Sequence, residues 1–138
     1  MINSRSLSDL NPKVAALCSE FINRCKEKGI DVIITSTYRD AESQNALYAQ
    51  GRTTDGKIVT NAKGGQSYHN WRVAFDFCPI VNGKCQWQDA DLFATCGRIG
   101  EDLGLEWAGR WSGKFKETAH LQFTGGLSLA DFQNGKTL

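Results

Sequence analysis

The sequence predicts an α+β fold in which a small antiparallel sheet is flanked by about three helices. One observation is the order of the segments, whose periodicity follows the course helix, strand, helix, strands, helix, strands. Another is the pair Asn82-Gly83, which is typical of a two-residue β-hairpin and makes at least part of the sheet antiparallel. No repeat or linker interrupts the pattern, so a single domain over residues 1–138 is expected.

Helices are predicted where apolar residues recur at helical spacing between a capping residue and a stop. The first has the clearest signals: Asn11 is a good N-cap, Pro12 suits the first helical position and Gly29 stops the pattern. Asp40 is expected to cap a second helix that ends at Gly51. The remaining expected ranges are 89–103 for a third helix and 129–132 for a short last one.

Strands are predicted where β-branched or alternating residues lie between turn signals. The expected ranges are 31–37, 72–78, 84–87, 105–107 and 119–123. Residues 52–66 are polar and glycine-rich and show no periodicity. A loop of this length in so small a domain is more often functional than idle, so we expect it to line a substrate groove or to move on binding.

The composition is that of an ordinary globular protein and excludes several functions. Apolar residues make up 41% of the chain, charged residues 22%, and the net charge is +1, so no strong field draws it to nucleic acid or a membrane surface. The N-terminus lacks the apolar core of a signal peptide, and no segment approaches 18 apolar residues. A cytoplasmic location without membrane insertion is therefore expected. The five cysteines are expected to be thiols, although Cys78 and Cys85 flank the hairpin and could meet across it.

Both histidines of the chain lie in polar-aromatic contexts beside expected strands. Asp76 alternates with bulky apolar residues in its strand, so its carboxylate faces away from them, where His69 can fold back from the preceding turn to share a cation. A carboxylate between two phenylalanines is costly without such a partner. His120, from another short strand, would complete two imidazoles and one carboxylate with an open coordination position, a pattern typical of a catalytic zinc site.

Glu117 lies three residues before His120 and is the candidate general base. A carboxylate just outside a set of zinc ligands can take a proton from the metal-bound water and pass it to the leaving amine. The pair His69 and Asp76, or the pair His120 and Glu117, is more simply interpreted on its own as a hydrogen-bonded histidine beside an acidic residue. The occurrence of both halves in one chain favours a site.

Two motifs in fixed order, Ser67-x-His69-x(4)-Ala74-x-Asp76 and Glu117-x-x-His120-x-Gln122, resemble those of the D-alanyl-D-alanine carboxypeptidase and dipeptidase family of zinc peptidases. This VanY-like group includes phage endolysins that cut the L-alanyl-D-glutamate bond of peptidoglycan. The upstream segment Ser36-Thr-Tyr-Arg39, with Gln44, also follows the family pattern. The resemblance implies a Hedgehog/D,D-peptidase-like fold, with Zn²⁺ held by His69, Asp76 and His120 and with Glu117 as the base.

The same resemblance suggests roles for three further residues and reveals two departures from the family pattern. Arg39 matches an arginine near the substrate carbonyl, where it would stabilise the oxyanion, and Ser67 and Gln122 would bind or position the substrate. Arg72 stands where glycine is frequent, and it either contacts an acidic group of the substrate or faces solvent. Ala119 stands where proline is frequent. Neither change removes a ligand. The sequence does not decide whether the two tryptophans Trp107 and Trp111 form a wall of the cleft or pack in the core.

The function implied by the resemblance is that of a monomeric phage endolysin without a separate cell-wall-binding domain. It would cleave the L-alanyl-D-glutamate bond of peptidoglycan stem peptides to lyse the host. It would stay in the host cytoplasm until a holin or membrane damage gives it access to the wall. The alternatives are a D-alanyl-D-alanine carboxypeptidase or dipeptidase, a non-catalytic zinc-containing domain of the Hedgehog type, and a metal-free binding module.

Overall fold

A five-stranded antiparallel sheet lies at the centre of the molecule in the computed structural model, which describes residues 1–138 except for the side chain of Lys114. The strand order is β1-β2-β5-β4, and β3 pairs with the far end of β2. The strands are β1 (Asp31–Ser36), β2 (Ala74–Val81), β3 (Lys84–Cys85), β4 (Glu106–Trp107) and β5 (His120–Gln122). The predicted α+β class with an antiparallel sheet is therefore confirmed.

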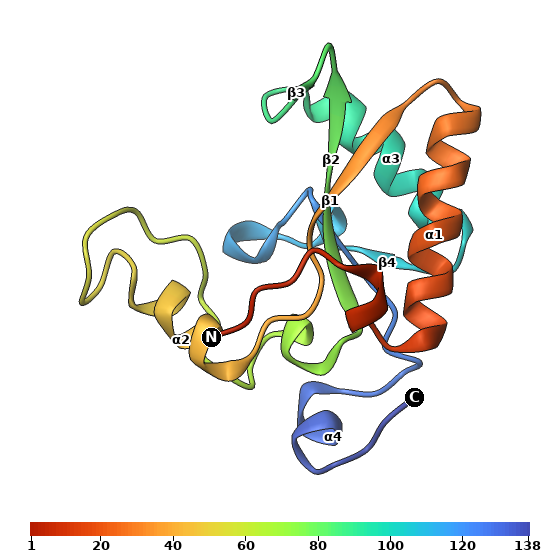
Figure 1. Cartoon of the computed structure of the whole chain (residues 1–138). Helices are drawn as coiled ribbons and strands as arrows, with labels where there is room; N and C mark the ends of the chain where they lie inside the picture. Colours follow the sequence, from red (N-terminus) through yellow and green to blue (C-terminus); the bar gives the residue numbers. More distant parts are fainter.

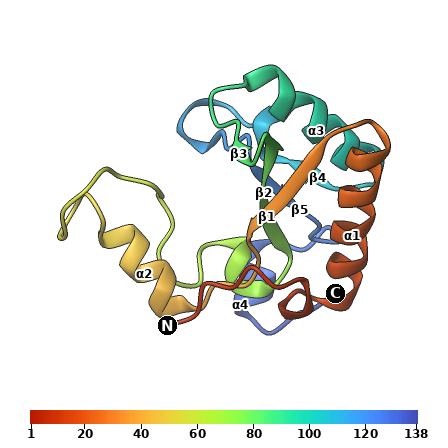
Figure 2. The ribbon, with the colours of Figure 1, turned by 45° about the horizontal axis from the view of Figure 1, so that its top comes forward.

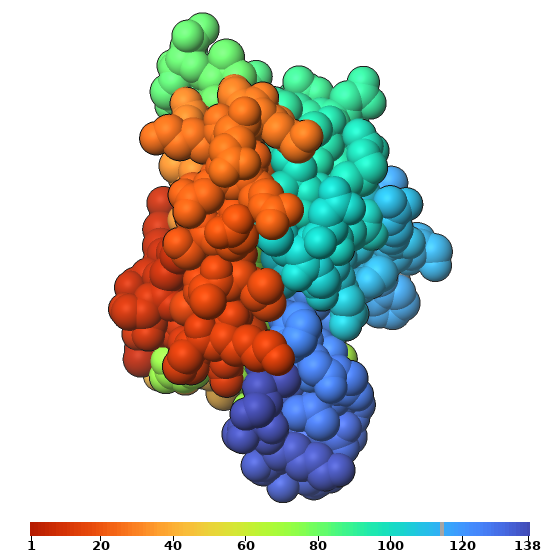
Figure 3. Space-filling view, turned by 90° about the vertical axis from the view of Figure 1, so that its right-hand side faces the viewer, coloured from red at the N-terminus to blue at the C-terminus, as the bar shows by residue number. Residues whose placement is uncertain are grey.

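Two long helices cover one face of the sheet, while a third stands apart on the other side (Figure 1, Figure 2). The α-helices are α1 (Pro12–Glu27), α2 (Ala41–Ala49), α3 (Ala90–Asp102) and α4 (Leu129–Gln133). Figure 3 shows the outer surface on which α1 and α3 lie side by side, with the C-terminal segment below them. Short 3-10 helices are η1 (Leu7–Asp9), η2 (Tyr68–Trp71), η3 (Ala108–Arg110) and η4 (Gly113–Phe115). None of the described helices combines the length and apolarity needed to cross a bilayer.

The hydrophobic core fills the space between the sheet and the α1–α3 layer. The ring of Phe21 in α1 contacts those of Phe75 and Phe77 in β2, with centroids 5.8 and 5.1 Å apart. These three side chains are fully buried, and each contributes about 1.5–3 kcal/mol by leaving water. Because side chains alternate along a strand, Asp76 faces the opposite side of β2 from the two phenylalanines, as predicted.

The predicted helix starts are confirmed by capping contacts. Asn11 accepts a hydrogen bond from the Lys13 backbone N–H, and Asp40 accepts one from that of Ser43. Asp89 and Ser128 cap α3 and α4 in the same way. Each cap satisfies a backbone donor that the helix itself leaves unpaired.

The strand around Asp76 differs in its limits from the prediction. It begins at Ala74 rather than at 72, because the residues before it form η2, whose C-cap Arg72 lies in the left-handed region with φ +64°. The returning strand of the hairpin is shorter than predicted and contains only Lys84 and Cys85. Asn82 and Gly83 both have positive φ, as the predicted hairpin turn requires.

Candidate metal centre and active site

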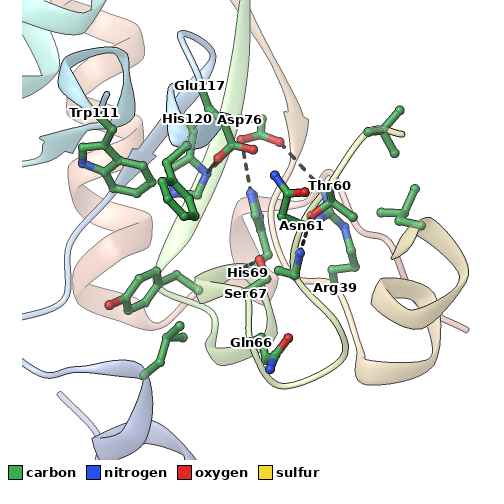
Figure 4. Close-up of a pocket in the computed structure, with 16 residues that line it drawn as sticks. Arg39, Thr60, Asn61, Gln66, Ser67, His69, Asp76, Trp111, Glu117 and His120 are labelled. Atoms are coloured by element: carbon green, nitrogen blue, oxygen red, sulfur yellow. Dashed lines mark hydrogen bonds and ion pairs between the residues drawn. The ribbon is translucent and has the colours of Figure 1, made fainter. Parts of the chain in front are cut away.

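A cleft of about 480 Å³ opens on the side of the sheet away from α1. Its floor carries His69, Asp76 and His120 (Figure 4). One wall comes from residues 59–67, in the predicted loop after α2, and the other comes from residues 111–117. The expectation that the loop 52–66 lines a groove is thus met by its second half.

Three different elements bring the two histidines and the aspartate together. Asp76 and His120 lie directly opposite each other in the antiparallel pair of β2 and β5, and His69 comes from η2 just before β2. One carboxylate oxygen, Oδ1 of Asp76, lies 3.1 Å from His69 Nε2 and 3.3 Å from His120 Nδ1. One ligand atom from each residue therefore points to a shared centre, with all three within 4.8 Å of one another.

Hydrogen bonds behind the rings determine which nitrogen of each histidine faces the centre. His69 Nδ1 lies 2.8 Å from the carbonyl oxygen of Thr37, which can only accept, so Nδ1–H is the donor and Nε2 is left for a cation. His120 Nε2 lies 2.8 Å from Oε1 of Gln122. The Gln122 amide is oriented in turn because its Nε2 donates to Glu106 at 3.3 Å. Nδ1 of His120 is thereby left for the centre.

The surroundings of Asp76 keep its carboxyl group ionised. Burial would raise the pKa of the Asp76 carboxyl, but the charge of His69 and hydrogen bonds from both histidines outweigh it and hold that pKa well below its usual range. Burial lowers the pKa of His120, but the hydrogen bond and charge of Asp76 with the charge of Glu117 reverse this, so the net shift is upward. Asp76 is thus a carboxylate that faces a ring nitrogen of each histidine, and it can accept protons from the rings or bind a cation that replaces those protons.

The donor set fits a divalent metal, and zinc in particular. Two imidazole nitrogens and one carboxylate oxygen are the ligands of catalytic zinc sites, which keep one position open for water or substrate. Here the open side faces the cleft. Within the described part of the chain, these three residues form the group of potential ligands that is close enough to hold an ion.

Glu117 lies beside this set without belonging to it. Its Oε2 is 3.8 Å from His120 Nδ1, and its side chain is 52% exposed at the rim of the cleft. A carboxylate in this place can reach a water or a substrate group on the open side of the centre. Figure 4 shows Glu117 approaching the ligands from the side of Trp111.

Arg39 approaches the same centre from the side of α2 (Figure 4). Its two terminal nitrogens donate to Gln44 Oε1 at 2.9 Å and Ser36 Oγ at 3.1 Å, and one of them lies 3.9 Å from Asp76. Its Nε is buried and has no hydrogen-bond partner among the described residues. Burial lowers the pKa of Arg39. The charges of Asp76 and Glu117 act in the opposite direction but do not reverse this shift, so the pKa stays below its usual value. A positive charge therefore lines the cleft, while the one donor without a partner is buried.

The two predicted substrate residues have different surroundings. Ser67 lines the cleft and caps η2, its Oγ accepting the backbone N–H of His69 at 3.2 Å. Gln122 is only 2% exposed and is not among the described residues that line the cleft. Its side chain faces His120 rather than the substrate space, so the structure gives it a supporting place behind a ligand.

The structure also shows where the residues lie whose roles the sequence left undecided. Trp107 is buried and its Nε1 donates to the Thr118 carbonyl, so it belongs to the core, whereas Trp111 lines the cleft 5.7 Å from the His120 ring. Arg72 does not line the described cleft; its guanidinium stacks over Tyr38 at 3.8 Å.

Two residues that hold the cleft together received no role from the sequence, where Gln44 was noted only as part of the family pattern and Asn70 was missed. Gln44 has its side chain between Arg39 and the Ala62 carbonyl, to which it donates at 2.8 Å. The side chain of Asn70 accepts the backbone N–H groups of Gly65 and Ser67 and donates to the Arg39 carbonyl. The only local signal was the spacing of Ser67 and Asn70, which matches a capping box.

Comparison with known proteins agrees with this geometry. Residues 7–125 match the profile of the family described as VanY: D-alanyl-D-alanine carboxypeptidase. The chain is 38% identical over 130 residues to the peptidoglycan L-alanyl-D-glutamate endopeptidase CwlK of Bacillus subtilis (strain 168), covering 83% of this chain and 74% of that protein. It is 30% identical over 125 residues to the L-alanyl-D-glutamate peptidase of Listeria phage A118, covering 87% of this chain and 41% of the phage protein.

A solved structure has a similar fold. The vancomycin-resistance D,D-pentapeptidase VanY, crystallised in complex with Zn(II), superposes with a TM-score of 0.63 at 14% identity and covers 91% of this chain and 84% of that one. At this identity the likeness concerns the fold alone. The profile match over residues 7–125 and the CwlK relative show that this chain belongs to the VanY family of D-alanyl-D-alanine carboxypeptidases.

Proposed function

We propose that this protein is a zinc-dependent endopeptidase that cleaves the L-alanyl-D-glutamate bond of peptidoglycan stem peptides. The observation that carries the proposal is a carboxylate, Glu117, at the edge of a cleft whose floor holds His69, Asp76 and His120. The names of the bacterial and phage relatives support the choice of bond.

The roles of the chain's own residues follow from their positions. A zinc ion on the three ligands would polarise the scissile carbonyl and lower the pKa of a water towards roughly 7. Glu117, whose Oε2 lies 3.8 Å from His120 Nδ1, would accept the proton of the attacking water and return it to the leaving amine. The guanidinium of Arg39 lines the cleft and lies 3.9 Å from Asp76, where its positive charge can stabilise the negative charge that develops on the carbonyl oxygen.

The shape and chemistry of the cleft suit a short peptide. Its volume lies within the range of about 300–1,000 Å³ usual for small-ligand sites. One wall presents hydroxyl and amide groups from Thr60, Asn61 and Gln66, which can bind a peptide backbone, and the other presents the aromatic ring of Trp111. Polar groups facing an apolar surface fix the orientation of a bound chain.

The biological setting is proposed separately from the chemistry. The phage relative supports the role of an endolysin that lyses its host once a holin or membrane damage gives it access to the wall. The Bacillus subtilis relative supports a bacterial wall enzyme with the same bond specificity. Expression in the cytoplasm of a bacterium, with and without a co-expressed holin, tests the endolysin role: lysis that requires the holin supports it, and failure to lyse with the holin present contradicts it.

The alternative function is removal of terminal D-alanine, which the description of the family profile favours. Digestion of purified muropeptides followed by mass spectrometry distinguishes the two. The proposed activity releases a peptide that begins with glutamate, whereas a carboxypeptidase releases free D-alanine. Release of D-alanine alone contradicts the proposed bond specificity.

The role of Glu117 is tested in the same digestion. Glu117→Gln keeps the shape of the side chain and removes the proton acceptor, so we expect turnover to fall by about 10²–10⁴-fold while zinc stays bound. Chelation of the metal should abolish wild-type cleavage, and added zinc should restore it. Full activity of Glu117→Gln, or of the chelated protein, would refute the mechanism.

A further inference from the structure

We propose that Asn70 is a positioning residue that holds Arg39 in register with the metal ligands. The inference rests on the proposed function, because it gives Asn70 a task only if Arg39 acts on a substrate. It concerns a side chain at an unspecified position of the first motif, which does not belong to the described lining of the cleft.

The side-chain amide of Asn70 has its hydrogen-bonding capacity filled. Oδ1 accepts the backbone N–H groups of Gly65 at 3.0 Å and of Ser67 at 3.1 Å. Nδ2 donates to the carbonyl oxygens of Arg39 at 2.8 Å and of Asp40 at 3.4 Å. An amide is the neutral side-chain group that offers two donors and two acceptor sites in this arrangement.

These bonds tie Arg39 to the helix that carries a metal ligand. The backbone N–H of Arg39 donates to the His69 carbonyl at 3.2 Å. The carbonyl of Arg39 accepts a hydrogen bond from Nδ2 of Asn70, the residue after His69. Two consecutive residues of η2 thus hold the backbone N–H and the backbone carbonyl of Arg39. A shift of η2 relative to the 39–40 segment would therefore move the guanidinium relative to His69.

The same side chain also fixes the cleft wall next to the ligands. Through Gly65 and Ser67 it closes the turn that leads into η2, and Ser67 in turn caps the helix at the His69 N–H. Asn70 is consequently the point where the floor, one wall and the Arg39 segment meet. A misplacement of about 1 Å in such a constellation can cost on the order of 10²-fold in rate.

An aspartate at position 70 provides the sharpest substitution. Asn70→Asp has the same shape and keeps both acceptor contacts, but it replaces the donor with an oxygen that repels the carbonyls of Arg39 and Asp40. Asn70→Ser is a second, neutral variant that loses the reach to Arg39. The matched control is Asn45→Asp, which changes the charge equally on the neighbouring α2 and keeps its contact to the Gly64 N–H, an acceptor contact of 2.8 Å.

The experiment compares wild type, the variants at 70, Arg39→Ala, the double variant Asn70→Asp/Arg39→Ala and the control. Full-length zinc-loaded proteins are assayed for kcat and KM on muropeptides, for zinc affinity by chelator competition and for Tm. We expect Asn70→Asp to lower kcat by about 10–100-fold, with KM and zinc affinity within about threefold of wild type. In the Arg39→Ala background the same change should lower kcat less than about twofold, because residues that act through one another are not additive. Asn45→Asp should match wild type.

Several results would overturn the inference. If Asn70→Asp lowers kcat equally with and without Arg39, the residue does not act through Arg39. If zinc affinity falls in parallel with kcat in both variants at position 70, the residue supports the ligands or the fold instead. A zinc-loaded wild type that cuts no muropeptide refutes the proposed function and the inference with it. An active wild type with an equally active Asn70→Asp refutes the inference alone.

Discussion

The floor of the cleft and its walls are built in different ways. On the floor, Asp76 and His120 face each other in a regular antiparallel pair, and both histidines are at least 95% buried. The walls contain little regular structure, and Val59, at the edge of one of them, is 53% exposed. The comparison suggests that backbone pairing fixes the chemistry of the site, whereas contacts with substrate depend on irregular segments that can vary without disturbing it.

The strongest test of this comparison removes a ligand from the floor. Asp76→Ala takes away the oxygen that both histidines approach. Loss of a residue that only hydrogen-bonds to a metal ligand lowers metal affinity by up to roughly 100-fold, so we expect zinc affinity to fall by more than this when a ligand itself is lost. Peptidase activity should disappear with it. Metal analysis after dialysis against a weak chelator measures the effect, and stoichiometric zinc in the variant would contradict the assigned ligand set.

The next effect concerns the support behind His120. Gln122→Leu keeps a similar volume but removes the acceptor that orients the ring, so we expect zinc affinity to fall by about 10–100-fold. Thr124→Val is the control, because it removes the other hydrogen bond to Glu106 and leaves Gln122 intact. Chelator competition gives both affinities. Wild-type affinity in Gln122→Leu would show that the amide does not fix the imidazole.

The floor could be predicted from the sequence because its geometry follows from local rules. Alternation along β2 places Asp76 opposite the core phenylalanines, and the motif spacing supplies the histidines. The direction of Gln122 could not be predicted in this way. It depends on the register of β4 against β5, which sets Glu106 opposite Gln122 and turns the amide towards His120.

The walls were beyond local rules for a different reason. The segment 52–66 was expected to be a functional loop, but its path is set by side chains that reach it from elsewhere. Gln44 in α2 holds the Ala62 carbonyl, and Arg52 holds the Thr60 carbonyl at 3.0 Å while its guanidinium stacks over Tyr48. Such contacts leave no periodic signal in the sequence, so the existence of the loop and its place beside a groove could be inferred, but its path could not.

A smaller effect is expected where a wall residue contacts substrate. Val59→Ser should raise KM by about two- to fivefold and leave kcat and Tm unchanged, because an exposed apolar contact contributes equally to substrate and transition state. Its neighbour Ile58 is equally exposed but is not part of the cleft lining that the structure describes, so Ile58→Ser is the control. Steady-state kinetics on muropeptides measures both. Equal KM changes in the two variants would mean that the effect does not depend on a position in the wall of the cleft.

The smallest effect is expected at Arg72, which follows η2 and is not part of the described cleft lining. Its φ of +64° costs a non-glycine residue about 1–2 kcal/mol, and the glycine frequent at this position in the family would avoid that cost. Arg72→Gly, however, loses the stacking over Tyr38 and a hydrogen bond to the Asp9 carbonyl, each worth about 1 kcal/mol.

These opposing changes should nearly cancel in Arg72→Gly, leaving the free energy of unfolding within about 1 kcal/mol of wild type and kcat/KM within about twofold. Arg72→Val is the matched comparison, because it loses the same contacts and keeps the backbone strain, so its Tm should be several degrees lower, at roughly 4 °C per kcal/mol. Thermal unfolding and muropeptide kinetics measure the pair. A tenfold loss of kcat/KM in Arg72→Gly at unchanged Tm would instead mean that Arg72 reaches the substrate, and that the boundary between floor and wall extends past η2.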